Sequence, residues 1–132
     1  MKRLIVDVQP GEYTVARLDA GAAVPAGFLD QPGLVSVTRT SVELSIVCPS
    51  EGAPQVEASQ AGWRLLTVRG PLEFTLTGIM AALSGELAAA GVSLFAMSTY
   101  DTDHLLVKAF DLDRAVLALR TAGHEVPDPV FD

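Results

Sequence analysis

Residues 93–108 read SLFAMSTYDTDHLLVK, in which two apolar runs enclose the polar segment TYDTDH. The apolar runs are short and rich in residues that favour strands, and the Thr and Asp residues between them favour a turn. The stretch therefore predicts a β-hairpin with strands over residues 92–98 and 104–108.

The segments on both sides of this hairpin predict two helices and two further strands. Apolar residues recur every three or four positions on either side of it, and a glycine follows each helical run. The expected elements are a strand over residues 63–70, a helix over residues 75–90 capped by Thr75, a helix capped by Asp111 that ends at Gly123, and a strand over residues 124–126. The resulting order, β-α-β-β-α-β, is the ferredoxin-like arrangement.

A weaker copy of the hairpin precedes it in the sequence. The stretch LVSVTRTSVELSIVC at residues 34–48 aligns without a gap with residues 94–108, at an offset of 60, and shares its pattern of apolar and polar positions. A strand is expected over residues 13–19, but residues 22–30 hold only a short helical turn because prolines break the segment. The pattern indicates an internal repeat whose first copy has a degenerate first helix.

The repeat predicts an α+β protein of two ferredoxin-like units, residues 1–62 and 63–132. A unit of about 60 residues is marginally stable alone, so we expect the two units to pack side by side. Residues 49–62 are the expected connector, and residues 3–8 an additional edge strand.

Composition and charge limit the classes of partner. Of the 132 residues 49% are hydrophobic, enough for a packed core, and the formal net charge is −7. An acidic surface repels phosphate backbones, so no nucleic-acid partner is expected. The sequence has no apolar run of about 18 residues, so no membrane span is expected. Cys48 is the single cysteine, which excludes an internal disulfide, and we expect a soluble cytoplasmic protein.

Two groups of residues raise the question of catalysis. Asp101, Asp103 and His104 offer metal ligands, but successive side chains of a strand point to opposite faces, and no second ligand cluster is near in sequence. Cys48 with His104 or His124 would be a nucleophile, but no glycine-rich elbow surrounds it, and an inert thiol is expected. No nucleotide-binding or zinc-protease motif occurs. We therefore predict no catalytic residues, no metal and no cofactor.

The stretch RGPLEFTLTGIM at residues 69–80 places a Gly-Pro turn before the first predicted helix. Free N–H groups at a helix N-terminus favour an anionic group such as an α-carboxylate. Glu73 precedes this helix, where it either pairs with an α-amino group or complements the helix dipole. The sequence leaves both interpretations open.

Residues 68–108, VRGPLEFTLTGIMAALSGELAAAGVSLFAMSTYDTDHLLVK, resemble the second unit of tandem ACT-domain proteins. These are small stand-alone bacterial proteins related to the animal cytosolic arginine sensors and to the regulatory domains of aspartate kinases. The resemblance extends over residues 63–126 and, more weakly, over residues 13–48. It implies a regulatory, non-catalytic fold that holds a free amino acid between two ACT units.

The resemblance also implies which residues bind the ligand. Backbone groups near Gly70 and the end of the strand at residues 98–100 would hold the carboxylate, and Glu73 or an aspartate of the turn would bind the amine. The first unit would supply the facing surface. The implied site comprises Gly70, Pro71, Leu72, Glu73, Ser98, Thr99, Tyr100, Asp101 and Asp103, with Arg39, Thr40 and Ser41 from the first unit.

Three functions remain in order of preference. The first is an amino-acid sensor, whose macromolecular partner is either a second copy or an unknown target protein. The second is an interaction or oligomerisation module without a ligand, which would use exposed sheet edges. The third is an enzyme built on the TYDTDH cluster.

Overall fold

The computed structural model describes residues 3–70 and 78–129, and its contacts divide the chain into two compact units. The first unit is Gly11–Trp63, and the second unit combines Met1–Pro10 with Arg64–Asp132. The division into residues 1–62 and 63–132 stays a prediction. The compact units differ from it because the first ten residues belong to the second unit.

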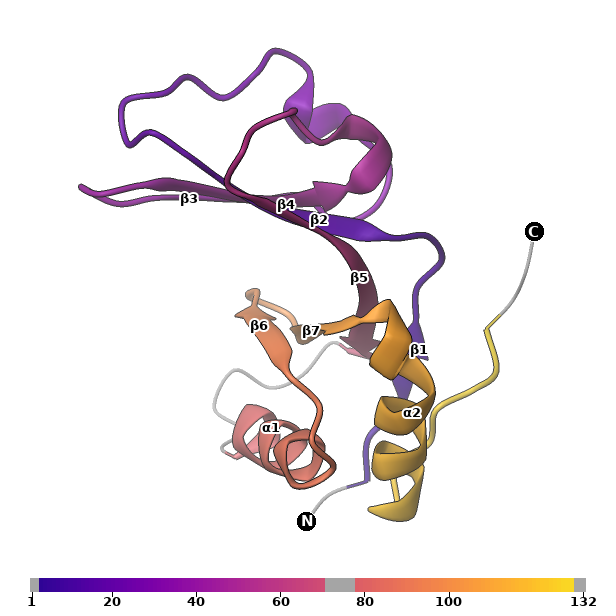
Figure 1. Ribbon diagram of the computed structural model, residues 1–132. Coiled ribbons are helices and arrows are strands. Elements are labelled where there is room, and N and C mark those ends of the chain that lie inside the picture. Colours follow the sequence, from indigo (N-terminus) through magenta and orange to yellow (C-terminus); the bar gives the residue numbers. More distant parts are fainter. Residues whose placement is uncertain (1–2, 71–77, 130–132) are drawn as a thin grey trace. The chain divides into compact units, whose positions relative to one another are not determined.

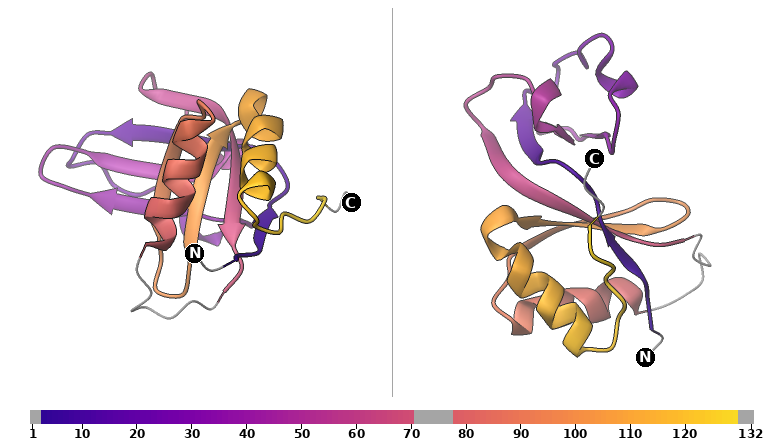
Figure 2. Two further views of the ribbon diagram at one scale, coloured as in Figure 1. Left: turned by 90° about the horizontal axis from the view of Figure 1, so that it is seen from below. Right: turned by 90° about the vertical axis from the view of Figure 1, so that its right-hand side faces the viewer.

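The second unit contains two helices and antiparallel strands in the order β1-β5-β7-β6. Its elements are β1 (Val6–Val8), the second half of β5 (Ser59–Val68), α1 (Ile79–Ala89), β6 (Leu94–Ser98), β7 (Asp103–Lys108), the 3-10 turn η3 (Ala109–Asp111) and α2 (Leu112–Thr121). Both helices cover the same face of these strands (Figures 1 and 2). The α+β class and the predicted β-α-β-β-α part of the ferredoxin-like order are therefore correct for this unit.

The fourth strand of this ferredoxin-like unit comes from the opposite end of the chain from the one predicted. A closing strand was expected over residues 124–126, but β1 pairs with β5 instead, with Val6 opposite Val68 and Val8 opposite Leu66. Once β1 occupies this edge of β5, the C-terminal segment can only add outside β1. It does so through one parallel bridge, Ile5 to Glu125.

The helices pack on the strands through apolar side chains, as their sequence spacing predicts. The buried cluster contains Val6, Leu66, Val68, Leu83, Leu87, Leu105, Val107, Ala115 and Leu119, among others. Within the described residues, no helix is long and apolar enough to cross a membrane.

Both helices end at the predicted glycines, but their N-termini agree only partly with the predicted caps. Gly91 and Gly123 follow α1 and α2 with φ of 78° and 100°, a left-handed conformation that glycine adopts without strain. Asp111 does precede α2 but makes no side-chain cap bond. α1 begins at Ile79, after Gly78, so its start is later than predicted, and Thr75 lies outside the described residues.

The first unit has the same strand order, β3-β4-β2-β5, but no α-helix. Its elements are β2 (Tyr13–Leu18), the 3-10 turn η1 (Phe28–Asp30), β3 (Ser36–Arg39), β4 (Leu44–Pro49), the 3-10 turn η2 (Ser50–Gly52) and the first half of β5. A short first helix was predicted. The structure has only the three-residue turns η1 and η2 at the two positions where the second unit has helices. The small core formed by Ala16, Phe28, Leu44, Ile46 and Cys48 reflects this loss.

The two hairpins correspond at an offset of 59, one residue less than the alignment predicted. Arg39 pairs with Leu44, and Ser98 pairs with Asp103, so each hairpin closes over four residues. The first residue of both turns is a threonine whose backbone N–H donates to the carbonyl oxygen at the fourth position, Thr40 to Glu43 at 2.9 Å and Thr99 to Thr102 at 2.8 Å. Sequence pattern alone missed the shift because both offsets match apolar with apolar positions at most sites.

A buried histidine joins both ends of the second unit to α1. The side chain of His124 accepts the backbone N–H of Leu4 at Nδ1 (3.2 Å), and its Nε2 lies 2.9 Å from Oε1 of Glu86. Because Nδ1 accepts, Nε2 carries the proton and donates to the carboxylate. Nearby, the backbone N–H of Glu125 donates to the carbonyl of Leu4 (2.9 Å). His124 therefore holds the N-terminal strand to the end of α2.

Replacing His124 by alanine is expected to lower the free energy of unfolding by about 2–4 kcal/mol. The substitution leaves the buried N–H of Leu4 without an acceptor and opens a cavity. Urea denaturation measures the change, and Glu125→Ala, at the next and exposed position, is expected to cost less than about 0.5 kcal/mol. A cost below about 1 kcal/mol for His124→Ala contradicts the assigned role.

Candidate functional site

The end of β5 is fixed by the N-terminal strand before the chain reaches Gly70. The guanidinium of Arg69 forms two bonds to Asp7 of β1, from Nε to Oδ2 at 2.9 Å and from Nη2 to Oδ1 at 2.6 Å. This carboxylate raises the pKa of Arg69. The backbone N–H of Arg69 also donates to the carbonyl of Ile5 at 2.8 Å. The residue just before Gly70 is thus held in place by β1 and the segment that precedes it.

The turn between β6 and β7 is attached to this same strand end. The hydroxyl of Thr102 donates to the carbonyl oxygen of Val68, the last residue of β5. The turn is closed internally by the N–H of Thr99, which donates to the Thr102 carbonyl. As a result, Gly70 and the polar turn lie at one end of the strands of the second unit.

The two acids of the turn have different surroundings. The hydroxyl of Ser98 donates to Oδ1 of Asp103, so this carboxylate is engaged across the hairpin. Asp101 is exposed, and within the described residues no bond of its carboxylate is recorded. Tyr100 is 82% exposed. Asp101 is therefore the acid of the turn whose carboxylate is not engaged by another described residue.

The remaining predicted site residues fall into two groups. Arg39, Thr40 and Ser41 are exposed at the hairpin of the first unit, where the Arg39 guanidinium donates to the carbonyls of Ala20 and Ala22. Pro71, Leu72 and Glu73 lie outside the described residues. The structure brings Gly70 and the segment from Ser98 to Asp103 together in one unit.

The contacts of His104 do not fit the role of metal ligand that its sequence context offered. Its Nδ1 lies 3.0 Å from the hydroxyl of Thr67 on β5. Burial lowers the pKa of His104, and the nearby Asp103 carboxylate opposes this shift. Among the described residues, no group of three or more His, Cys, Asp or Glu side chains is arranged to hold a metal. The contacts of His104 favour a structural role between β5 and β7.

Cys48 is completely buried in the core of the first unit. Burial raises the pKa of its thiol, which disfavours the thiolate that a nucleophile requires.

Sequence reasoning missed three contacts that shape the site. These are the Thr102 hydroxyl, the Thr67 partner of His104, and the Asp7–Arg69 pair. Each joins residues at least 34 positions apart, so neither periodicity nor motif spacing could have found them.

Comparison with known proteins matches the two parts of the chain separately. A family model described as an ACT domain matches residues 58–121, and a model for an N-terminal domain matches residues 11–56. A crystal structure of protein Atu0741 from Agobacterium tumefaciens is 37% identical, covers all of both chains and has a TM-score of 0.88.

More distant relatives match only in part. The "Cytosolic arginine sensor for mTORC1 subunit 1" of Homo sapiens is 46% identical over 46 residues, which are 34% of this chain and 14% of the sensor. The aspartate kinase of Synechocystis is 18% identical, with 96% of this chain and 28% of the kinase covered and a TM-score of 0.64. At that identity the kinase supports the fold alone.

The fold and these matches identify residues 58–121 as an ACT domain. More narrowly, the chain belongs to the family of Atu0741, with which it aligns over its whole length.

The pH dependence of stability is expected to reflect His104. Because its folded pKa lies below the ordinary value of about 6.5, the unfolded chain binds the proton more readily. This contribution to stability is complete above pH of about 6.5 and is lost as pH falls from there through the folded pKa.

Urea unfolding at stepped pH measures this loss, with His104→Gln as the control that removes the titration. Asp103→Asn is expected to lower the His104 pKa further in an NMR titration, because it removes the charge that raises it. An unchanged or higher pKa contradicts the assignment.

Proposed function

We propose that this protein is a non-enzymatic, cytoplasmic regulator that binds a free amino acid through its ACT domain. The observation that carries the proposal is the bond from the Thr102 hydroxyl to the Val68 carbonyl, which brings the polar turn to the strand end that precedes Gly70. Exposed polar side chains at this place suit a small zwitterion.

In the proposed site the two charged groups of the amino acid bind different partners. Backbone groups near Gly70 and the end of β6 hold the α-carboxylate, and the uncommitted carboxylate of Asp101 binds the α-amine. Asp103 supports the turn through its bond with Ser98. Glu73 remains a second proposed partner for the amine or for a basic ligand side chain.

Arginine is the first ligand to test. A relative that is 46% identical over 46 residues is named a cytosolic arginine sensor. The acidic residues of the proposed site and the formal net charge of −7 favour a cationic ligand over an anionic one.

We further propose that the first unit is a reduced ACT unit, so that the protein is a tandem repeat of residues 1–62 and 63–132. The matched strand order and the equivalent threonine turns at Thr40 and Thr99 support this. Arg39, Thr40 and Ser41 stay the proposed ligand-facing surface of this unit, and its packing beside the second unit stays part of the proposal.

An interaction module without a ligand is the second candidate. Large apolar side chains favour it, since Tyr100, Phe110 and Leu117 are 82%, 84% and 66% exposed. Light scattering as a function of concentration separates this function from the first, because a module of this kind associates without any amino acid.

A thermal-shift screen of the 20 amino acids is expected to give a hit, with arginine as the leading candidate. A ligand at 100 times its Kd adds about 2.7 kcal/mol to the stability of the folded state. If no amino acid at millimolar concentration raises the unfolding temperature, the proposed function is wrong.

Asp101→Asn is expected to weaken binding of that amino acid by about tenfold. A charge-assisted bond to an amine contributes about 1.5–3 kcal/mol, and the amide loses the charge while keeping the shape. Calorimetric titration measures the Kd, and Asp30→Asn, at an exposed position of the first unit, is the matched control. If the two substitutions change the Kd equally, the α-amine of the ligand does not bind Asp101.

A further inference from the structure

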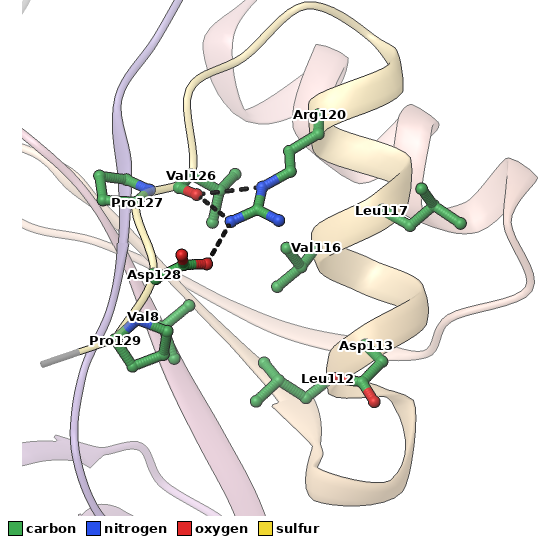
Figure 3. A pocket seen from close by; sticks show the side chains of 10 residues that line it. All are labelled: Val8, Leu112, Asp113, Val116, Leu117, Arg120, Val126, Pro127, Asp128 and Pro129. Carbon is green, nitrogen blue, oxygen red and sulfur yellow. Dashed lines mark hydrogen bonds and ion pairs between the residues drawn. The ribbon is translucent and has the colours of Figure 1, made fainter. Parts of the chain in front are cut away.

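A cavity of about 330 Å³ lies between α2 and the C-terminal segment of the second unit (Figure 3). One side is the face of α2 and the other side is β1 with the chain after Gly123. Its lining residues are Val8, Leu112, Asp113, Val116, Leu117, Arg120, Val126, Pro127, Asp128 and Pro129. None of these belongs to the site proposed for an amino acid.

The walls of the cavity are mostly apolar. Seven of the ten lining residues are Val, Leu or Pro, and they come from three separate parts of the chain. Apolar walls with a small number of polar groups, in a volume of at least about 300 Å³, are typical of sites for small organic ligands. The cavity is therefore suited to an apolar ligand tail.

Arg120 places a fixed positive charge at this cavity. Its Nε and Nη2 donate to the Val126 carbonyl, with the Nε distance 3.0 Å, and Nη2 also donates to Asp128 at 3.1 Å. For Nη1 no bond is recorded within the described residues, and Figure 3 shows it on the side that faces Val116. A guanidinium held in this way loses little further side-chain entropy when it binds a ligand.

Of the three charged residues at the cavity, Arg120 is the one that suits an acidic ligand, and the other two are Asp113 and Asp128. Arg120 is the one cationic residue among the described lining residues. The Asp128 carboxylate is already paired with it, and Figure 3 shows Asp113 at the opposite end of the cavity from Arg120. A ligand tail that lies along Val116 thus brings its head group to the guanidinium.

We propose that this cavity binds small monocarboxylates with an apolar tail. The carboxylate accepts from Nη1 of Arg120, and the tail lies against Leu112, Val116 and Val126. Because binding closes the space between α2 and the C-terminal segment, it stabilises the position of that segment on the helix. This site is independent of the amino-acid site proposed above.

Calorimetric titration of the intact protein with acetate, butyrate and hexanoate tests the proposal. Affinity is expected to rise about fourfold for each added methylene, which corresponds to ~0.8 kcal/mol for burying one methylene. Hexylamine, with one more methylene in its tail and the opposite charge, is expected to bind at least tenfold more weakly than hexanoate. A saturating amino acid from the screen is expected not to compete.

Two variants separate the charge from the cavity. Arg120→Met removes the cation, and Val116→Trp fills the space while Arg120 is kept, so each is expected to weaken hexanoate binding at least tenfold. Circular dichroism and the unfolding temperature show whether each variant is folded. Arg17→Met and Leu29→Trp, at exposed positions of the first unit, are the matched controls and are expected to bind as the original protein does.

Several results would overturn the proposal. They are undetectable hexanoate binding, equal affinity for hexylamine, or unchanged hexanoate affinity in either folded variant. A mass that doubles with concentration and returns to that of a monomer in Val116→Trp would also overturn it, because the cavity would then be filled by a second copy.

Discussion

The backbone pairing of β5 is the constraint on which the rest of the structure depends. Ten consecutive residues, Ser59–Val68, form one strand whose first half pairs with β2 and whose second half pairs with β1. Buried backbone groups must be paired, so the buried half of the strand, residues 63–68, cannot be left without a neighbour. β5 thereby acts as the last strand of the first unit and the first strand of the second.

The dependence on β5 extends to the candidate site. Val68 is held by Val6 on one side, and its carbonyl accepts the hydroxyl of Thr102. Thr67, one residue earlier, contacts His104 of β7. The contacts of Val68 and Thr67 at the end of β5 thus fix the position of the polar turn. The exposed side chains of the turn are not needed to hold it in place.

Local sequence signals predicted much of the second unit. The hairpin around residues 99–102, the ends of both helices at glycine and the burial of the apolar faces all depend on contacts between near neighbours. The origin of the fourth strand could not be predicted, because only the competition between residues 4–8 and residues 124–126 for one edge of β5 decides it. The offset of 59 required the registers of the hairpins, which a pattern of alternating residues does not specify.

The candidate site was predictable in the same limited sense. The residues from Ser98 to Asp103 were identified from their polarity in an apolar context. The sequence did not predict that Asp103 is bonded and Asp101 is not. This difference depends on which of the two acids lies opposite Ser98 in the hairpin. For the first unit, the prolines near residues 25 and 32 correctly indicated a lost helix. Residues 49–62 were expected to be a connector with one short helical turn, and they hold the three-residue turn η2.

The pairing of β1 with β5 also has a consequence for the order of folding. Val8 lies opposite Leu66, so without residues 11–63 these strands would form a simple hairpin, and the first unit is an insertion into its loop. When β2 and β5 pair at Tyr13 and Trp63, the ends of this insertion are already drawn together. The loop-closure entropy for β1 then falls from that of more than 50 free residues to that of a few. Once the first unit has formed, β1 can therefore pair with β5 at a small cost in chain entropy.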